Sequence, residues 1–192
     1  MQERQVTLDG NTERLSEPFV VFATQNPIEY EGVYPLPEAQ LDRFSVKVRV
    51  GYPSREDEIE ILKRRLDRKS DDVQVEKVTN SAQICEAQKC VESVHVDDVV
   101  LSYATEIARS TRSNHNVAVG VSPRGTTMLI KLARASALLK GMDYVIPDHV
   151  KAMVVPCMSH RLVLKPESWT RGTTPAGVLR EVLMAVPVPK AD

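Results

Sequence analysis

The sequence has few aromatic residues and almost no net charge. Phe, Trp and Tyr together make up 5% of the 192 residues, and 25 basic residues face 26 acidic ones, which gives a formal net charge of −1. Proteins that bind nucleic acid usually carry a basic surface, and those that bind single strands add aromatic side chains on which bases stack. The composition therefore argues against a nucleic-acid-binding protein.

Cysteines are also few, and long apolar runs are absent. The three cysteines, Cys85, Cys90 and Cys157, are an odd number, and no His or Cys stands near the first two to complete a zinc site. No apolar stretch approaches the roughly 20 residues that cross a bilayer, and the polar N-terminal MQERQVTLDG does not resemble a signal peptide. We therefore expect a cytoplasmic protein with reduced thiols, no membrane span and no metal-ligand set of its own.

The first 68 residues predict a small amount of α/β structure. The segment 5–15 is expected to be a hairpin that turns at Asp9-Gly10. The apolar run FVVFA at 19–23 suits a strand covered on both faces, and SVKVRV at 45–50 alternates like a second strand. Because two such strands and a hairpin do not make a self-sufficient sheet, the sequence looks cut at its front end.

Helical patterns occupy most of the remaining sequence. A short helix is expected from Pro37 to about Leu41, and a charged helix with Ser54 as its N-cap runs to about Arg68. Residues 69–79 are expected to be a linker. Residues 80–192 are expected to form a helical domain, with helices over about 80–91, 97–112, 123–140 and 147–160 and an apolar segment at 178–186.

Three polar residues stand where a ligand could be contacted, although each also has an ordinary structural interpretation. Asn26 follows the buried-type strand, where α/β enzymes place ligand-contacting side chains, but it could be a simple turn residue. Arg43 ends the short helix and could pair with Asp42 or act on a phosphate in a neighbouring subunit. Arg124 lies in the first turn of a helix, where it could be solvated or help to bind an anion.

Other motifs exclude common active sites. GVSPRGTT at 120–127 has the glycine spacing of a P-loop, but Thr126 stands where that motif needs lysine, so the segment is not expected to hold phosphates. The acidic loop residues Glu29, Glu31, Glu38 and Asp42 are expected to be solvated rather than to bind a metal. The histidines show neither metal-ligand pairing nor a catalytic triad; they are His95, His115, His149 and His160.

One long stretch is far more specific than these patterns. ATQNPIEYEGVYPLPEAQLDRF at 23–44, VRVGYPSREDE at 48–58 and SPRGTTMLIKLARASALLKGMDYVIPDHVKAMVVPCMSHRL at 122–162 closely resemble the MoxR family of AAA+ ATPases. The resemblance implies an α/β remnant of a P-loop NTPase core over residues 1–68, followed by the all-α lid domain of that family. It also implies a ring, expected to be a hexamer, that couples ATP hydrolysis to the remodelling or maturation of a protein client.

The same resemblance gives roles to the three polar residues. Asn26 matches sensor 1, which positions the attacking water, and Arg43 in LDRF matches the arginine finger that acts across a subunit interface. Arg124 in SPRG matches sensor 2 of the lid. Gly125 departs from the family, which tends to have alanine there, and this is expected to weaken the start of the helix slightly.

The family's P-loop and its acidic Mg²⁺-binding motif are missing from the 192 residues. ATP and Mg²⁺ would therefore be bound mainly by residues upstream of Met1, and the chain alone is expected to be inactive. An alternative remains a helical module that binds another protein without catalysis.

Overall fold

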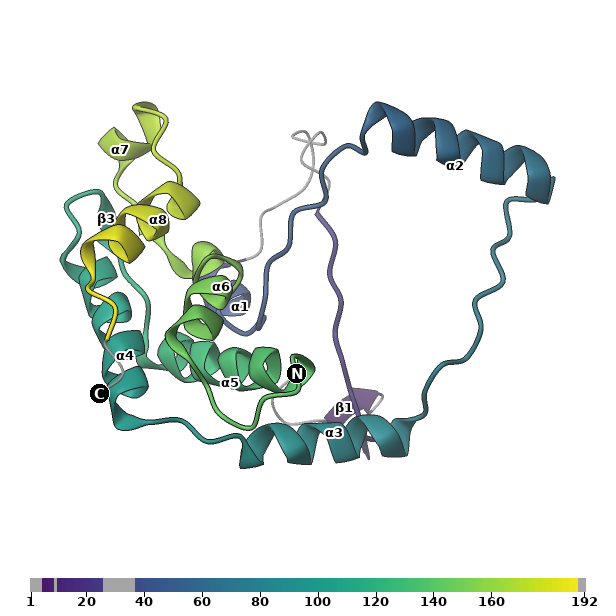
Figure 1. Ribbon diagram of the computed structural model, residues 1–192, viewed down its shortest axis with the longest axis horizontal. Coiled ribbons are helices and arrows are strands. Elements are labelled where there is room, and N and C mark those ends of the chain that lie inside the picture. Colours follow the sequence, from purple (N-terminus) through teal and green to yellow (C-terminus); the bar gives the residue numbers. More distant parts are fainter. Residues whose placement is uncertain (1–4, 9, 26–36, 190–192) are drawn as a thin grey trace.

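The computed structural model describes residues 5–8, 10–25 and 37–189 and shows a helical body from which two segments extend (Figure 1). The N-terminal hairpin is present as expected. Strands β1 (Gln5–Leu8) and β2 (Asn11–Arg14) pair antiparallel, with Gln5 opposite Arg14. Gly10 turns the chain at φ +84°, a conformation that glycine adopts without steric cost.

The two strands expected at 19–23 and 45–50 are not present in the structure. Both segments form no ladder and are extended, with side chains largely in solvent: Phe22 is 91% exposed and Val50 is 96% exposed. A strand requires a neighbouring strand for its N–H and C=O groups, and the described residues pair no strand with either segment; the Lys47 amide alone bonds to the Pro156 carbonyl of α6, at 2.9 Å. The prediction of a strand covered on both faces at 19–23 and of an alternating strand at 45–50 is therefore wrong for the described residues, which leave both segments exposed.

Helix α1 (Glu38–Leu41) is short, and α2 (Arg55–Arg68) lies apart from the helical body (Figure 1). Ser54 caps α2 by accepting a 3.2 Å bond from the Asp57 amide, as the sequence predicts. Lys69, at φ +53°, ends the helix. None of the residues of α2 is buried, and an extended segment leads from its end back to the helical body (Figure 1).

The helical body contains every buried apolar side chain of the described residues, and these lie between Val94 and Val186. Helices α5 and α6 form the main contact, and α4 and α8 pack against α6. Its helices are α3 (Ser81–Ser93), α4 (Asp98–Ser113), α5 (Pro123–Leu139), α6 (Pro147–Met158), α7 (Pro166–Thr170) and α8 (Pro175–Ala185).

Side chains cap most of these helices where the sequence predicts a start. Asn80 and Gln83 form a reciprocal capping box on α3, and Asp97 accepts a 2.8 Å bond from the Val99 amide on α4. Pro123 and Pro147 occupy the first turns of α5 and α6, where proline has no amide to lose. The four expected long helices therefore lie within a few residues of their predicted bounds.

The structure adds elements that the patterns did not predict. Strands β3 (Val117–Val119) and β4 (Val163–Leu164) pair antiparallel, and a 3₁₀ turn, η1 (Ser159–Arg161), continues α6. These pieces are too short to leave a periodic signal. No helix in the described part of the chain combines the length and the apolar character needed to cross a membrane.

Candidate functional site

The Arg43 turn is the tight turn that follows α1, residues 41–44. The amides of Arg43 and Phe44 each donate 3.1 Å bonds, to the carbonyls of Gln40 and Leu41 respectively. These i to i+3 bonds continue the helix as a 3₁₀-like turn. Arg43 is exposed at its tip, whereas Asp42 and Phe44 on either side are partly buried.

Arg161, on η1, binds both neighbours of Arg43. Its Nε donates to Asp42 Oδ1 at 2.9 Å, and its Nη2 donates to the carbonyls of Asp42 at 3.1 Å and Phe44 at 2.7 Å. The Arg161 side chain is 1% exposed and that of Asp42 is 27% exposed. The guanidinium is planar and carries its donors on three separate nitrogens, so it can reach a carboxylate and two carbonyls that lie apart, a geometry that the single nitrogen of lysine does not reproduce.

His160 binds the same turn. Its Nε2 lies 2.9 Å from the Phe44 carbonyl and 2.9 Å from Arg161 Nη1. Nε2 cannot donate to the carbonyl and accept from Arg161 in one tautomer, so we assign the proton to Nε2, which satisfies Phe44. His160 Nδ1 is then a buried acceptor without a partner among the described residues. Burial lowers the pKa of His160 below its usual 6.5, against the opposing effect of the Phe44 bond.

Arg124 lies in the first turn of α5. Ser122 caps that turn, accepting a 3.4 Å bond from the Gly125 amide. The loop before it is fixed to α4, because the Arg112 guanidinium donates to the Val121 carbonyl at 2.7 Å. Arg124 is therefore held at a capped helix N-terminus, half-buried and with interactions of its own.

Gly125 brings the N-terminus of α5 against Arg161. A Cβ added at Gly125 would lie 3.0 Å from Arg161 Cδ and 2.6 Å from a Val121 methyl group. Glycine therefore allows close packing here, in addition to its expected weakening of the helix start. Cys157 Sγ lies 3.8 Å from the Gly125 carbonyl on the same side.

Two of the three predicted site residues are therefore next in the chain to residues that contact one buried side chain, Arg161. Arg43 lies between the two residues that Arg161 binds, and Arg124 precedes the glycine that packs on it. Asn26 lies outside the described residues. Arg161 and His160 were not among the predicted site residues, because a histidine was expected to act only as a metal ligand or as a member of a triad. The sequence offered one weak indication of them: His160 and Arg161 stand at the end of the predicted helix, and cations are favoured near a helix C-terminus.

Cys157 lies beneath the Arg161 guanidinium, 3.7 Å from Nη1, and its carbonyl also accepts from Nη1. The thiol is fully buried, and burial raises its pKa to about 11, although the positive charge of Arg161 opposes the shift. A thiol with that pKa is protonated at neutral pH, so Cys157 is a structural residue rather than a nucleophile.

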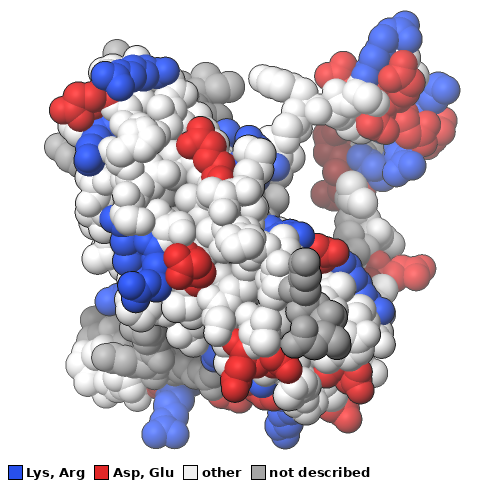
Figure 2. Space-filling model, turned by 60° about the vertical axis from the view of Figure 1, so that its left-hand side comes forward, with Lys and Arg blue, Asp and Glu red and all other residues white. Residues whose placement is uncertain are grey.

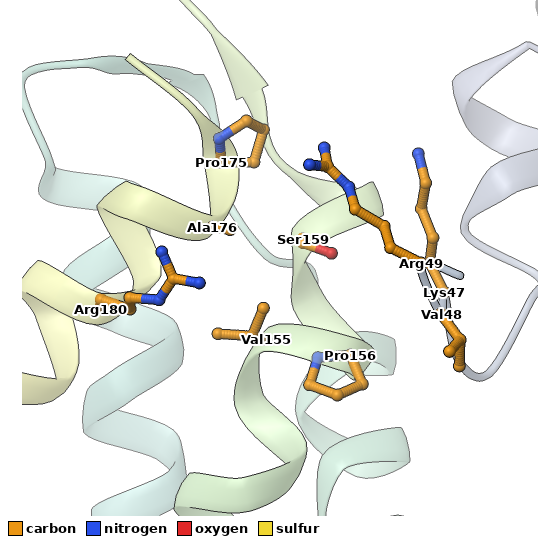
Figure 3. Close-up of a pocket in the computed structure, with 9 residues that line it drawn as sticks. All are labelled: Lys47, Val48, Arg49, Val155, Pro156, Ser159, Pro175, Ala176 and Arg180. Carbon is orange, nitrogen blue, oxygen red and sulfur yellow. The ribbon is translucent and has the colours of Figure 1, made fainter. Parts of the chain in front are cut away.

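A pocket of about 290 Å³ lies beside this region, between the extended residues 47–49 and helices α6 and α8 (Figure 3). Lys47 and Arg49 lie across the pocket from α8, and the guanidinium of Arg180 points into it from α8 (Figure 3). No carboxylate lines it, so its potential is positive. Elsewhere, charges of both signs are mixed over the face drawn in Figure 2.

Arg124, at the N-terminus of α5, has the chemistry to contact an anion such as phosphate. Arginines near a helix N-terminus can stabilise phosphate charge. Among the described residues, however, no three His, Cys, Asp or Glu side chains gather to hold a metal ion, and the 192 residues contain no P-loop sequence.

Two family models match the chain. The AAA lid domain matches residues 109–182, and the ATPase family associated with various cellular activities (AAA) matches residues 1–46. The uncharacterized protein YeaC of Bacillus subtilis is 45% identical over 190 residues, covering 98% of this chain and 59% of YeaC. The chaperone MoxR1 of Mycobacterium tuberculosis is 38% identical over 201 residues, covering all of this chain and 52% of MoxR1.

The fold itself matches a solved structure. The crystal structure of a candidate ATPase from Cytophaga hutchinsonii superposes with a TM-score of 0.90 at 32% identity, covering 98% of this chain and 60% of that one. The chain thus spans little more than half the length of the proteins it matches. Its architecture is that of an AAA+ C-terminal region: a remnant of the α/β core followed by a helical lid. The chain belongs to the MoxR-type AAA+ ATPases.

Proposed function

We propose that this chain is the C-terminal part of an ATP-hydrolysing ring subunit, expected to be a hexamer, that remodels or matures a protein client. Support comes from the family, in which rings are typical, and from the relative named a chaperone. The relatives are longer than this chain, and the apolar segments 19–22 and 46–50 lie exposed in it. Such exposure is expected if the rest of the core covers these segments in a longer protein. We call this chain, joined to such a nucleotide-binding part, the complete subunit.

The observation that carries the proposal is that chain neighbours of both Arg43 and Arg124 contact the same side chain, Arg161. In the proposal, Arg43 is the arginine finger that stabilises phosphoryl charge at the nucleotide of the neighbouring subunit. Arg124 binds phosphate as sensor 2, and Asn26 orients water as sensor 1. ATP, with its Mg²⁺, supplies the phosphoryl group to be transferred, and it is held mainly by residues outside this chain.

Replacing Arg43 in the complete subunit tests the proposal. Arg43→Ala should leave the ATP dissociation constant within about threefold and lower turnover about 1,000-fold or more, because a finger acts on the transition state. Arg171→Ala, an exposed arginine after α7, is the control and should behave like wild type. Equal turnover in Arg43→Ala and wild type would leave the helical binding module as the better account.

A further inference from the structure

One guanidinium accounts for most of the attachment of the Arg43 turn to the lid. Arg161 donates to the Asp42 carboxylate, the Asp42 carbonyl and the Phe44 carbonyl at 2.9, 3.1 and 2.7 Å. Two of these acceptors belong to the backbone immediately before and after Arg43. The attachment therefore fixes the backbone position of residue 43 and leaves its side chain exposed.

The same side chain also contacts the two central helices of the lid. Its Nη1 donates to the Cys157 carbonyl of α6, and its Cδ lies 3.0 Å from the place where a Cβ on Gly125 of α5 would be. A second backbone bond follows the turn, from the Lys47 amide to the Pro156 carbonyl at 2.9 Å. The Arg43 turn is thus held to the lid on both sides of residue 43.

We propose that Arg161, assisted by His160, is a positioning residue that makes the Arg43 turn and the lid move as one body. The proposal rests on the proposed function, since Arg43 is the group that it positions. A lid movement that shifts Arg124 would then shift Arg43 with it. Because catalytic groups lose about 100-fold in rate when displaced by about 1 Å, a firm attachment has a direct effect on turnover.

Backbone hydrogen exchange on the 192-residue chain tests the attachment itself. Arg161→Lys keeps the positive charge but loses the fork of donors. It should raise exchange tenfold or more at the Lys47, Arg43 and Phe44 amides. Asp42→Ala removes only the carboxylate acceptor and should give a smaller increase. Unchanged exchange in both variants would overturn the proposal. If Arg161→Lys does not fold, Asp42→Ala decides alone.

Turnover of the complete subunit tests the positioning. Arg161→Lys should lower kcat about 100-fold with KM for ATP within about threefold, and Asp42→Ala should lower kcat less. Because Arg161 acts through Arg43, the Arg43→Ala/Arg161→Lys double variant should be no slower than Arg43→Ala alone. A merely structural role would instead give multiplied losses in kcat, and that result, or a wild-type kcat in Arg161→Lys, would overturn the proposal.

Arg134→Lys is the matched control. Arg134 also joins lid elements, donating 2.9 Å bonds to the Val94 carbonyl and the Glu92 carboxylate, but it does not contact the Arg43 turn. Arg134→Lys should leave kcat and the exchange of the Arg43 and Phe44 amides unchanged. A loss of kcat as large as that of Arg161→Lys would count against a specific attachment.

The two proposals can fail separately. If Arg43→Ala itself has wild-type turnover, the proposed function fails and the positioning role fails with it. Hydrogen exchange still decides whether Arg161 attaches the Arg43 turn to the lid.

Discussion

The guanidinium of Arg161 lies 2.9 Å from Asp42 Oδ1, across 119 residues of sequence. This pair joins the end of the α/β remnant to the end of α6. It is the structural link between the two arginines to which we assign roles on phosphate, because Arg43 follows Asp42 and Gly125 packs on Arg161. Three predictions about stability and reactivity follow from the burial of this region, and a fourth concerns the activity of the ring.

Removing Arg161 should destabilise the lid. Arg161→Ala leaves the carboxylate and the carbonyl of Asp42 without their partner. Loss of one member of a buried pair costs about 3 kcal/mol or more. Denaturant unfolding measured by circular dichroism checks this. The control is Arg65→Ala. It breaks a surface ion pair between Arg65, on α2, and Asp71, which follows that helix, and should cost under about 1 kcal/mol. Equal losses in the two variants would contradict the assigned burial.

The thiols of Cys90 and Cys157 should react at very different rates. Cys90 is exposed, whereas Cys157 is fully buried with its pKa raised to about 11. Iodoacetamide at pH 8 should therefore modify Cys90 within minutes and leave Cys157 unmodified until the lid unfolds, because the thiolate is the reactive form. Mass spectrometry of tryptic peptides measures both sites. Comparable rates at Cys90 and Cys157 in the folded chain would contradict the structure.

Stability should fall as the pH is lowered from about 7 towards 5. Burial lowers the pKa of both His149 and His160 below 6.5 in the folded chain. The unfolded chain consequently binds more protons as the pH falls through 6.5, and the stability that is present above that pH declines until the lowered folded pKa values are reached.

Conservative replacements can isolate this effect. The His149→Asn/His160→Gln double variant should flatten the pH dependence without losing the bonds of the two histidines. The amide oxygen of Asn can replace His149 Nδ1, which accepts a 3.3 Å bond from the Ile146 amide, and the amide nitrogen of Gln can replace His160 Nε2 as donor. His115→Gln, at an exposed position, is the control and should keep the slope. Thermal unfolding between pH 5 and 8 gives the answer, and a double variant with the full slope would contradict the assignment.

The helices could be predicted from the sequence because their signals are local. Ser54, Asn80 and Asp97 cap the helices that follow them, and Pro123 opens α5 at the expected residue. The prediction of strands at 19–23 and 45–50 was wrong for this chain. An apolar pattern shows that a segment could be buried, but it does not show whether a neighbouring strand is present to pair with it. Pairing depends on neighbours that no local pattern contains.

The candidate site was only partly accessible to sequence reasoning. Arg43 and Arg124 could be identified through the family resemblance, and their roles stay predictions. Arg161 could not, because its importance arises from contacts with residues 42 and 44 that lie far away in the sequence. Cys157 likewise shows nothing in its sequence context that foretells a thiol buried under a guanidinium.

The most direct test of the account mixes two inactive complete subunits. One carries Arg43→Ala and keeps its nucleotide site, and the other carries Arg43 but has its P-loop lysine replaced. If Arg43 acts on the neighbour's nucleotide, random mixing at equal amounts should restore about one quarter of the wild-type ATPase rate, since half the sites are competent and half of those gain a finger. A mixture as inactive as its two components would contradict the account.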